Sequence, residues 1–274
     1  MNAVFRFTLL LLVLYCLYML LLFFLQRSMI FPGQSRSPEV LSTQHDQPLE
    51  EVWIDTSEGK VQTFFLSANP PFVQTLRPVV VFAHGNGELI QDWVHALITY
   101  LEMGIHVYLV EYPGYGNSAG MSSQQSIAET FDAAYGWVVQ RKDVDVSRII
   151  FHGRSIGGGV MIQLAAMYEP AAMILQSTFT SLRSFAKGYF VPGQLIRDPF
   201  DALPILKTYD KPLLIMHGDR DVIVPYQHAL DLKDLVPQAT VITYACGHND
   251  FPPSWQIYWK DISNFLRGAS IIEE

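Results

Sequence analysis

Apolar residues occur along this chain in two arrangements: one long unbroken run near the N-terminus, and many short runs separated by amphipathic stretches. The long run covers residues 7–25, FTLLLLVLYCLYMLLLFFL, and contains no charged residue. As a helix it would be roughly 28 Å long, close to the ~30 Å thickness of the hydrocarbon core of a bilayer. The pattern predicts one N-terminal transmembrane helix, and we assign residues 1–30 to a membrane anchor.

A secretory signal peptide is the main alternative for this segment. Its apolar region is usually about 7–15 residues long and leads to small residues at a cleavage site. Here the run is longer and is followed by QRSMIFP at residues 26–32, so we expect an uncleaved single-pass anchor. Arg6 on one side and Arg27 and Arg36 on the other leave the positive-inside rule with almost no bias. The side of the membrane therefore stays open, with the non-cytoplasmic side as our working assignment.

From residue 49 onward the short runs predict an α/β domain. Residues 52–56 and 61–66, joined by SEGK, are expected to form an antiparallel hairpin. Later runs are apolar at successive positions, as in strands that are buried on both faces of a parallel sheet. These runs lie at 79–83, 106–110, 149–152, 172–176, 213–216 and 241–244. Stretches with helical periodicity lie at 90–101, 127–140, 227–235 and 255–266.

This alternation of strands and helices predicts a doubly wound, mostly parallel sheet with an N-terminal antiparallel hairpin. We place this domain at residues 49–270 and a linker at residues 31–48. One segment interrupts the alternation, an insertion at about residues 178–211. Its large apolar residues are Phe179, Phe185, Tyr189, Phe190, Val191 and Phe200. Two interpretations stay open: an ordinary crossover with extra turns, or a small lid over an apolar pocket.

Composition excludes some functions. The formal net charge of −8 and the pI near 5.4 argue against nucleic-acid binding, which needs clustered Lys and Arg. The two cysteines, Cys16 and Cys246, belong to no C-x-x-C pair, so a zinc or redox site is not indicated.

The strongest chemical signal is GRSIG at residues 153–157, which matches G-x-S-x-G. It follows the apolar run at 149–152 and precedes a helical run at 160–167, the strand–turn–helix context that a nucleophilic serine turn requires. Ser155 is therefore the candidate nucleophile. A serine that only caps the following helix is the competing interpretation.

A serine hydroxyl needs a base, and the base needs an acid that orients it. In enzymes with this serine turn, the acid and the histidine follow the serine in the chain. Asp219 and Asp221 come directly after the strand at 213–216, and spacing alone does not choose between them. His248 follows the last strand and is the candidate base. We expect His228 to be solvated on a helix and His217 to be structural.

A tetrahedral intermediate also needs hydrogen-bond donors for its oxyanion. The backbone N–H of Ile156, directly after the nucleophile, supplies one. The second is expected from HGNG at residues 84–87, after the strand at 79–83, and we assign it to the N–H of Asn86. His84 lies at the strand end, where it is expected to hold this loop in place.

Together these motifs resemble the α/β-hydrolase superfamily, and more closely its membrane-anchored, single-domain branch related to serine aminopeptidases and monoglyceride lipases. The resemblance covers residues 50–266. It is carried by HGNG at 84–87, EYPGYGNSAG at 111–120, GRSIGGG at 153–159, HGDRDVIVP at 217–225 and GHND at 247–250. The family's H-G-x-x-D-x-x-V-P pattern implies that Asp221 is the acid. Glu111 departs from the pattern, because an aspartate is more usual there.

The predicted triad, the membrane anchor and the aromatic-rich insertion together favour a serine hydrolase that cleaves carboxylic esters of amphiphilic acyl substrates, such as acylglycerols or lysophospholipids, through an acyl-enzyme. Acyl-protein thioesterase and serine aminopeptidase activities are alternatives, and a non-catalytic scaffold on the same fold is a further one. We expect no metal and no organic cofactor, since side chains alone carry this chemistry. The expected partners are the acyl substrate and the membrane; the sequence indicates no oligomeric state.

Overall fold

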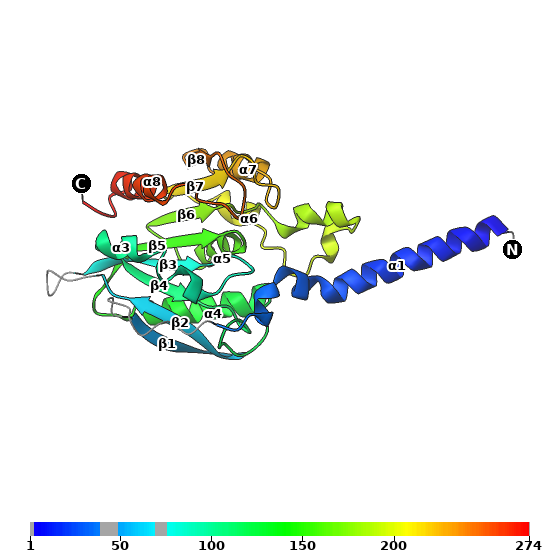
Figure 1. Ribbon diagram of the computed structural model, residues 1–274, viewed down its shortest axis with the longest axis horizontal. Helices are drawn as coiled ribbons and strands as arrows, with labels where there is room; N and C mark the ends of the chain where they lie inside the picture. Colours follow the sequence, from blue (N-terminus) through cyan, green and yellow to red (C-terminus); the bar gives the residue numbers. More distant parts are fainter. Residues whose placement is uncertain (1–2, 39–48, 69–75, 274) are drawn as a thin grey trace.

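The sheet predicted from the short apolar runs is the centre of the fold (Figure 1). The computed structural model describes residues 3–38, 49–68 and 76–273. Within them the strands are β1 (Leu49–Thr56), β2 (Gly59–Leu66), β3 (Arg77–Ala83), β4 (His106–Val110), β5 (Val144–Arg154), β6 (Ala172–Gln176), β7 (Leu213–Gly218) and β8 (Thr240–Tyr244). Their order is β1-β2-β4-β3-β5-β6-β7-β8. The β1–β2 and β2–β4 pairs are antiparallel and all other pairs are parallel, which confirms the predicted fold class.

Helices cover both faces of this sheet. They are α2 (Ile90–Trp93), α3 (Ile98–Glu102), α4 (Gln124–Val138), α5 (Ile156–Ala165), α6 (Leu203–Leu206), α7 (Gln227–Leu235) and α8 (Trp255–Gly268). Side chains of a strand point alternately to its two faces. In β3, Val79 and Val81 accordingly join the core under α4, α5 and α7, whereas Val80 and Phe82 join the core under α2, α3 and α8. This double burial explains why the strands read as continuous apolar runs.

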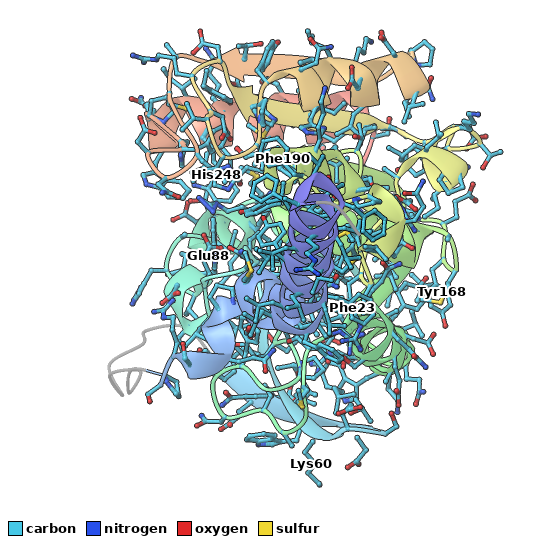
Figure 2. The ribbon with its side chains drawn as sticks, turned by 90° about the vertical axis from the view of Figure 1, so that its right-hand side faces the viewer. Phe23, Lys60, Glu88, Tyr168, Phe190 and His248 are labelled. Carbon is cyan, nitrogen blue, oxygen red and sulfur yellow. The ribbon has the colours of Figure 1, made fainter. Side chains whose placement is uncertain are left out.

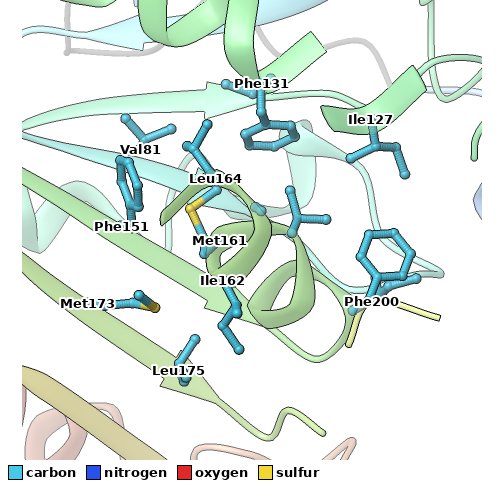
Figure 3. Close-up of a cluster of buried hydrophobic side chains, with 14 of the residues drawn as sticks. Val81, Ile127, Phe131, Phe151, Met161, Ile162, Leu164, Met173, Leu175 and Phe200 are labelled. Carbon is cyan, nitrogen blue, oxygen red and sulfur yellow. The ribbon is translucent and has the colours of Figure 1, made fainter. Parts of the chain in front are cut away.

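The core beside the serine turn is centred on α5. Met161 and Leu164 of α5 pack among Phe151 of β5, Phe131 of α4 and other apolar side chains of the same cluster (Figure 3). Every residue of α5 is half-buried or fully buried, which holds its N-terminus rigidly against the sheet. The residue that precedes α5 is Ser155, so this packing positions the candidate nucleophile.

The helix predicted at residues 90–101 is divided in the structure into α2 and α3, with a turn between them. Ile90, Val94, Leu97 and Leu101 are nevertheless all buried in one cluster. Two short helices that present the same face bury the same residues as one long helix. Hydrophobic periodicity therefore predicted the buried face correctly but not the break.

The N-terminal run forms one long helix, α1 (Ala3–Ile30), which projects from the domain (Figure 1). Its length and a mean hydropathy of 2.7 suit a membrane span, although a signal sequence shares these properties. The first part of the predicted linker packs on the domain. Phe31 is only 1% exposed, and Gly33 lies so close to the ring of Tyr115 that a Cβ there would overlap it. Residues 39–48 of the linker lie outside the described residues, and the predicted domain boundaries stay a prediction.

Candidate active site

The predicted nucleophile, Ser155, lies in the tight turn between β5 and α5. Its φ of 53° and ψ of −118° are rare for a residue with a side chain and are typical of a strained functional turn. The flanking glycines make this turn possible. A Cβ at Gly153 would lie 2.2 Å from the carbonyl oxygen of Gly157, and one at Gly157 would lie 2.1 Å from that of Ala83. Any larger residue at either position would have to displace backbone atoms.

The structure brings Ser155, His248 and Asp221 together at the carboxyl ends of the parallel strands. The hydroxyl oxygen of Ser155 lies 3.1 Å from Nε2 of His248. Nδ1 of His248 lies 2.6 Å from Oδ2 of Asp221. The side chain of Ser155 does not cap α5, which removes the structural basis for the competing interpretation as a capping serine. This geometry is what a base needs in order to take the serine proton.

The carboxylate next to His248 belongs to Asp221 and not to Asp219. Oδ1 of Asp221 accepts hydrogen bonds from the backbone N–H groups of Ile223 and Val224, at 2.9 and 2.8 Å. These bonds leave Oδ2 directed at the imidazole. The side chain of Asp219 is 48% exposed and faces a neighbouring arginine, so Asp221 is the one of the two aspartates that contacts His248.

Asp221 is placed to stay ionised. Burial alone would raise its pKa, but hydrogen bonds with His217, His248 and the Val224 N–H outweigh this effect and hold the pKa well below its usual range. A negative carboxylate at this position would stabilise a positive charge on the imidazole of His248. His217 also donates from Nε2 to the carbonyl of Val224, 2.8 Å away, so it supports the acid loop as a structural residue.

The two predicted oxyanion donors, Asn86 and Ile156, line the same cavity as Ser155. Ile156 is the first residue of α5, where backbone N–H groups have no partner within the helix. Within the described residues, no protein acceptor takes the N–H of Asn86. The carbonyl of Asn86 is held by the N–H of Gly33 at 3.2 Å and by the hydroxyl of Tyr115 at 2.7 Å. Asn86 is thus held through its carbonyl, while its own backbone N–H stays available as a donor.

A buried ion pair at the ends of β3 and β4 holds the loop that carries Asn86. Nε2 of His84 lies 2.6 Å from Glu111, and both side chains are fully buried. Burial alone would lower the pKa of His84, but Glu111 and the carbonyl of Gly85 raise it above its usual value. Glu111 also accepts the backbone N–H groups of Ile90 and Tyr112. Glu111, which departs from the family pattern, is therefore a positioning carboxylate. Sequence analysis assigned it no role.

Sequence analysis also missed Arg154, the variable residue of the serine motif. Its guanidinium lies 2.5 Å from Oε1 of Glu88 and donates to the carbonyl of His248 at 3.0 Å. Glu88 in turn accepts the N–H of Gly85 and the indole N–H of Trp93. Arg154 thus links the base loop to the oxyanion loop, and no local pattern in the sequence signals such a link.

His228, one of the alternative bases, lies away from this arrangement. It is half-buried and not solvated as expected: its ring stacks on Phe185 of the insertion, and its Nδ1 lies 3.1 Å from the hydroxyl of Thr180. The predicted surface histidine therefore supports the base of the insertion.

Known proteins resemble this chain in sequence and in fold. The family model described as serine aminopeptidase, S33, matches residues 74–198. Alpha/beta hydrolase domain-containing protein 17B of Xenopus tropicalis is 30% identical over 219 residues, which span 76% of this chain and 72% of the relative. The chain belongs to the α/β-hydrolase superfamily.

This hydrolase is also similar to a second sequence relative and to a solved structure. Alpha/beta hydrolase domain-containing protein WAV2 of Arabidopsis thaliana is 27% identical over 266 residues, covering 86% of the chain and 84% of the relative. The structure of an esterase from Pyrococcus furiosus superposes with a TM-score of 0.68 at 17% identity, covering 85% of this chain and 97% of the esterase. The sequence relatives support hydrolase activity, and the esterase structure supports the fold.

The hydrolase has an apolar cavity of about 360 Å³ that is open to Ser155 and His248, within the size range of small-molecule pockets. Its lining comes from three parts of the chain. The insertion contributes Phe179, Leu182, Phe185, Ala186, Tyr189, Val191, Leu195 and Ile196. The helix α1 contributes Met19, Leu22, Phe23, Gln26, Met29 and Ile30. The loops at the carboxyl ends of the strands complete it.

Within the insertion, the hydrolase forms two 3-10 helices, η2 (Leu182–Tyr189) and η3 (Gly193–Leu195), before α6. This segment lies beside α1 (Figure 1) and shares with Ser155 and His248 the lining of the cavity. Of the two interpretations of the insertion, the position over an apolar cavity favours the lid.

Proposed function

We propose that this chain is a membrane-anchored serine hydrolase that cleaves carboxylic esters of amphiphilic acyl substrates, such as acylglycerols or lysophospholipids. The observation that carries the proposal is the hydrogen-bonded series from Ser155 through His248 to Asp221, which opens into an apolar cavity. The series supplies a nucleophile, and the cavity suits an acyl chain.

In the first step, Nε2 of His248 takes the hydroxyl proton of Ser155. At the same time the hydroxyl oxygen of Ser155 bonds to the carbonyl carbon of the ester. The carbonyl electrons move onto the oxygen, which the N–H groups of Asn86 and Ile156 stabilise. When this intermediate collapses, the bond to the leaving alcohol breaks. His248 returns its proton to that alcohol, and the acyl group remains on Ser155.

In the second step, water attacks the acyl-enzyme. His248 takes a proton from the water, the same two N–H groups hold the second oxyanion, and the bond to Ser155 breaks. The acid product leaves, and Ser155 regains its proton from His248. Asp221 keeps its charge throughout and orients the imidazole.

The lining of the cavity supports an acyl substrate over a peptide with a free amino terminus. An aminopeptidase needs a negative group to bind the substrate's α-ammonium. None of the described residues that line the cavity is acidic. An acyl-protein thioesterase is the second candidate, because the cavity contacts the acyl part of a substrate and is indifferent to whether sulfur or oxygen leaves.

We infer that α1 is a permanent anchor and not a cleaved signal. The contacts between α1 and the domain support this inference. The amide nitrogen of Gln26 donates to the carbonyl of Leu195, its oxygen accepts the N–H of Arg197, and Arg27 pairs with the buried Asp198. Removal of α1 would also strip one wall from the cavity. The N-terminal sequence of the membrane-extracted protein tests the inference, and protease access in intact cells tests the non-cytoplasmic placement of the domain.

Two assays test the function. We expect a fluorophosphonate probe to label the wild type and not Ser155→Ala, and we expect p-nitrophenyl esters of long acyl chains to be hydrolysed faster than acetate. Labelling that persists in Ser155→Ala would place the nucleophile elsewhere. A folded wild type that neither reacts with the probe nor hydrolyses any ester would favour the scaffold. Comparison of matched oxygen and sulfur esters of one acyl chain distinguishes the esterase from the thioesterase.

A further inference from the structure

The α1 residues that line the cavity form one stripe of the helix. Met19, Leu22, Phe23, Gln26, Met29 and Ile30 recur at intervals of three and four, so they share one face. Leu20 and Leu21, which point elsewhere, are 52% and 57% exposed. A helix that only anchored the domain would need no such distinction between its faces, whereas a helix that forms the wall of a binding groove does.

The groove runs along the helix axis. Its catalytic end lies near Ile30, because Gly33 donates to the carbonyl of Asn86, next to the reaction site. From Ile30 to Met19 the helix rises by about 16 Å. One leaflet of the hydrocarbon core is about 15 Å thick, half of the ~30 Å total. The groove is therefore about as long as an acyl chain of one leaflet.

The tip of the insertion, residues 187–191, reaches the middle of the apolar run of α1. The hydroxyl of Tyr15 donates to the carbonyl of Phe190 at 2.7 Å, and that of Tyr18 donates to the carbonyl of Tyr189 at 2.9 Å. Figure 2, which looks along α1, shows Phe190 beside the helix. Phe190 is 80% exposed. An aromatic side chain with this exposure, next to a hydrocarbon-spanning helix, fits a lipid environment better than water.

Four backbone polar groups at the tip form hydrogen bonds, which lowers the cost of placing irregular structure in lipid. The N–H groups of Phe190 and Val191 donate to the carbonyls of Lys187 and Ala186, and Tyr15 and Tyr18 bind the two carbonyls already described. Lys187 is an exposed charged residue near this tip, and its long stem lets the ammonium group extend toward the headgroup layer.

Charged groups mark where the membrane surface crosses α1. The helix has no charge from residue 7 to residue 26, and Arg27 then pairs with Asp198 while Arg197 lies over the ring of Phe23. From Arg27 to Tyr15 the helix rises by about 18 Å, close to the thickness of one leaflet. The insertion tip thus extends to about the bilayer midplane, and the reaction site lies at headgroup level.

We propose that the cavity is an acyl groove immersed in one leaflet, in which the substrate's chain lies parallel to α1 as it does in the bilayer, with its carbonyl at Ser155. The occupant is a membrane lipid that moves sideways between α1 and the insertion. This rests on the proposed function for the chemistry, and adds that α1 itself sets the chain length.

The test replaces Leu22, which lines the groove, with Trp and compares it with Leu21→Trp on the lipid-facing side. The readout is the ratio of kcat/KM for p-nitrophenyl palmitate to that for p-nitrophenyl butyrate. We expect Leu22→Trp to lower this ratio by about tenfold or more, since each pair of excluded methylenes weakens binding by roughly that factor. Leu21→Trp should leave the ratio unchanged. An equal ratio in all three proteins would overturn the proposal.

A second measurement does not depend on turnover. A bimane label is attached to Phe190→Cys in protein that also carries Cys16→Ser. The control carries the label at Val146→Cys, at the opposite ends of the strands. Both proteins are placed in phosphatidylcholine vesicles that contain chain-brominated lipid. We expect bromine to quench the label at position 190 and not the label at position 146. No quenching at 190 would overturn the immersion. Quenching at 190 without Ser155-dependent turnover of any ester would refute the proposed chemistry and leave the groove standing.

Discussion

Arg27, in the last turn of α1, forms a two-pronged ion pair with Asp198 of the insertion. Nε lies 2.7 Å from Oδ2, and Nη2 lies 3.0 Å from Oδ1. Asp198 also accepts the backbone N–H of Gln124, the first residue of α4, at 2.9 Å. Its side chain is only 2% exposed. One buried carboxylate thus joins the apolar helix, the insertion and the catalytic domain.

Loss of the Arg27 guanidinium should destabilise the protein strongly. Arg27→Gln leaves the Asp198 charge buried without its cation, and we expect the free energy of unfolding to fall by roughly 3 kcal/mol, the lower end of such costs because Arg27 is partly exposed. Chemical denaturation in detergent measures this change. Lys60→Gln is the control, since its pair with Asp55 is exposed on both sides and should matter little. Equal effects of the two substitutions would show that the Arg27 pair is not structural.

The two neighbouring aspartates should differ sharply in their effect on catalysis. In Asp221→Asn the amide no longer holds His248 in the required tautomer, and we expect kcat to fall by roughly 10⁴. Asp219→Asn changes an exposed side chain outside the triad and should leave kcat unchanged. Steady-state ester hydrolysis measures both variants. Comparable losses in the two variants would refute the assignment of Asp221 as the acid.

Arg154 should act as a positioning residue. Arg154→Gln releases the carbonyl of His248 and the carboxylate of Glu88, so the base and oxyanion loops lose their link. We expect kcat to fall by roughly 10²-fold with little change in KM, as for a small displacement of catalytic groups. Arg154→Lys should recover only part of the loss, because one ammonium replaces the two-pronged guanidinium. A change confined to thermal stability, with kcat intact, would reduce Arg154 to a packing residue.

His152 should make stability depend on pH. Burial lowers its pKa to about 3 in the folded protein, whereas the unfolded value is about 6.5. Between these two pKa values, His152 is protonated in the unfolded chain and neutral in the folded protein. This contribution to stability is complete above about pH 6.5 and is lost as the pH falls toward 3, by up to about 1.4 kcal/mol per pH unit.

The control for this pH effect is His152→Gln, which keeps a hydrogen-bonding side chain near Tyr100 and Tyr258 but does not titrate. In urea unfolding, the free energy of unfolding should fall less between pH 7 and pH 5 for the variant than for the wild type. An identical loss in both proteins would assign the acid sensitivity to other groups. The raised pKa of His84 acts in the opposite direction and cancels in this comparison.

The sequence by itself determined the sheet and the serine turn, because both depend on local patterns. Strands buried on two faces read as continuous apolar runs, and the β6 and α7 boundaries match the predicted ranges. Gly153 and Gly157 are required by backbone contacts that every such turn makes. The positions of Ser155 and His248 follow from motifs at strand ends, and the structure places their side chains in contact; their catalytic roles stay a prediction.

Only the tertiary structure decided which distant residues act together. Arg27 and Asp198 are 171 positions apart, and His84 and Glu111 meet only because β3 and β4 are neighbours in the sheet. Spacing did not choose between Asp219 and Asp221, since both follow β7 and only the fold shows which one faces the imidazole. Likewise, the apolar run of α1 predicts an anchor but no preferred face. Its role as a groove wall depends on the insertion that packs against it, and the hydrophobicity of a segment carries no information about its partner.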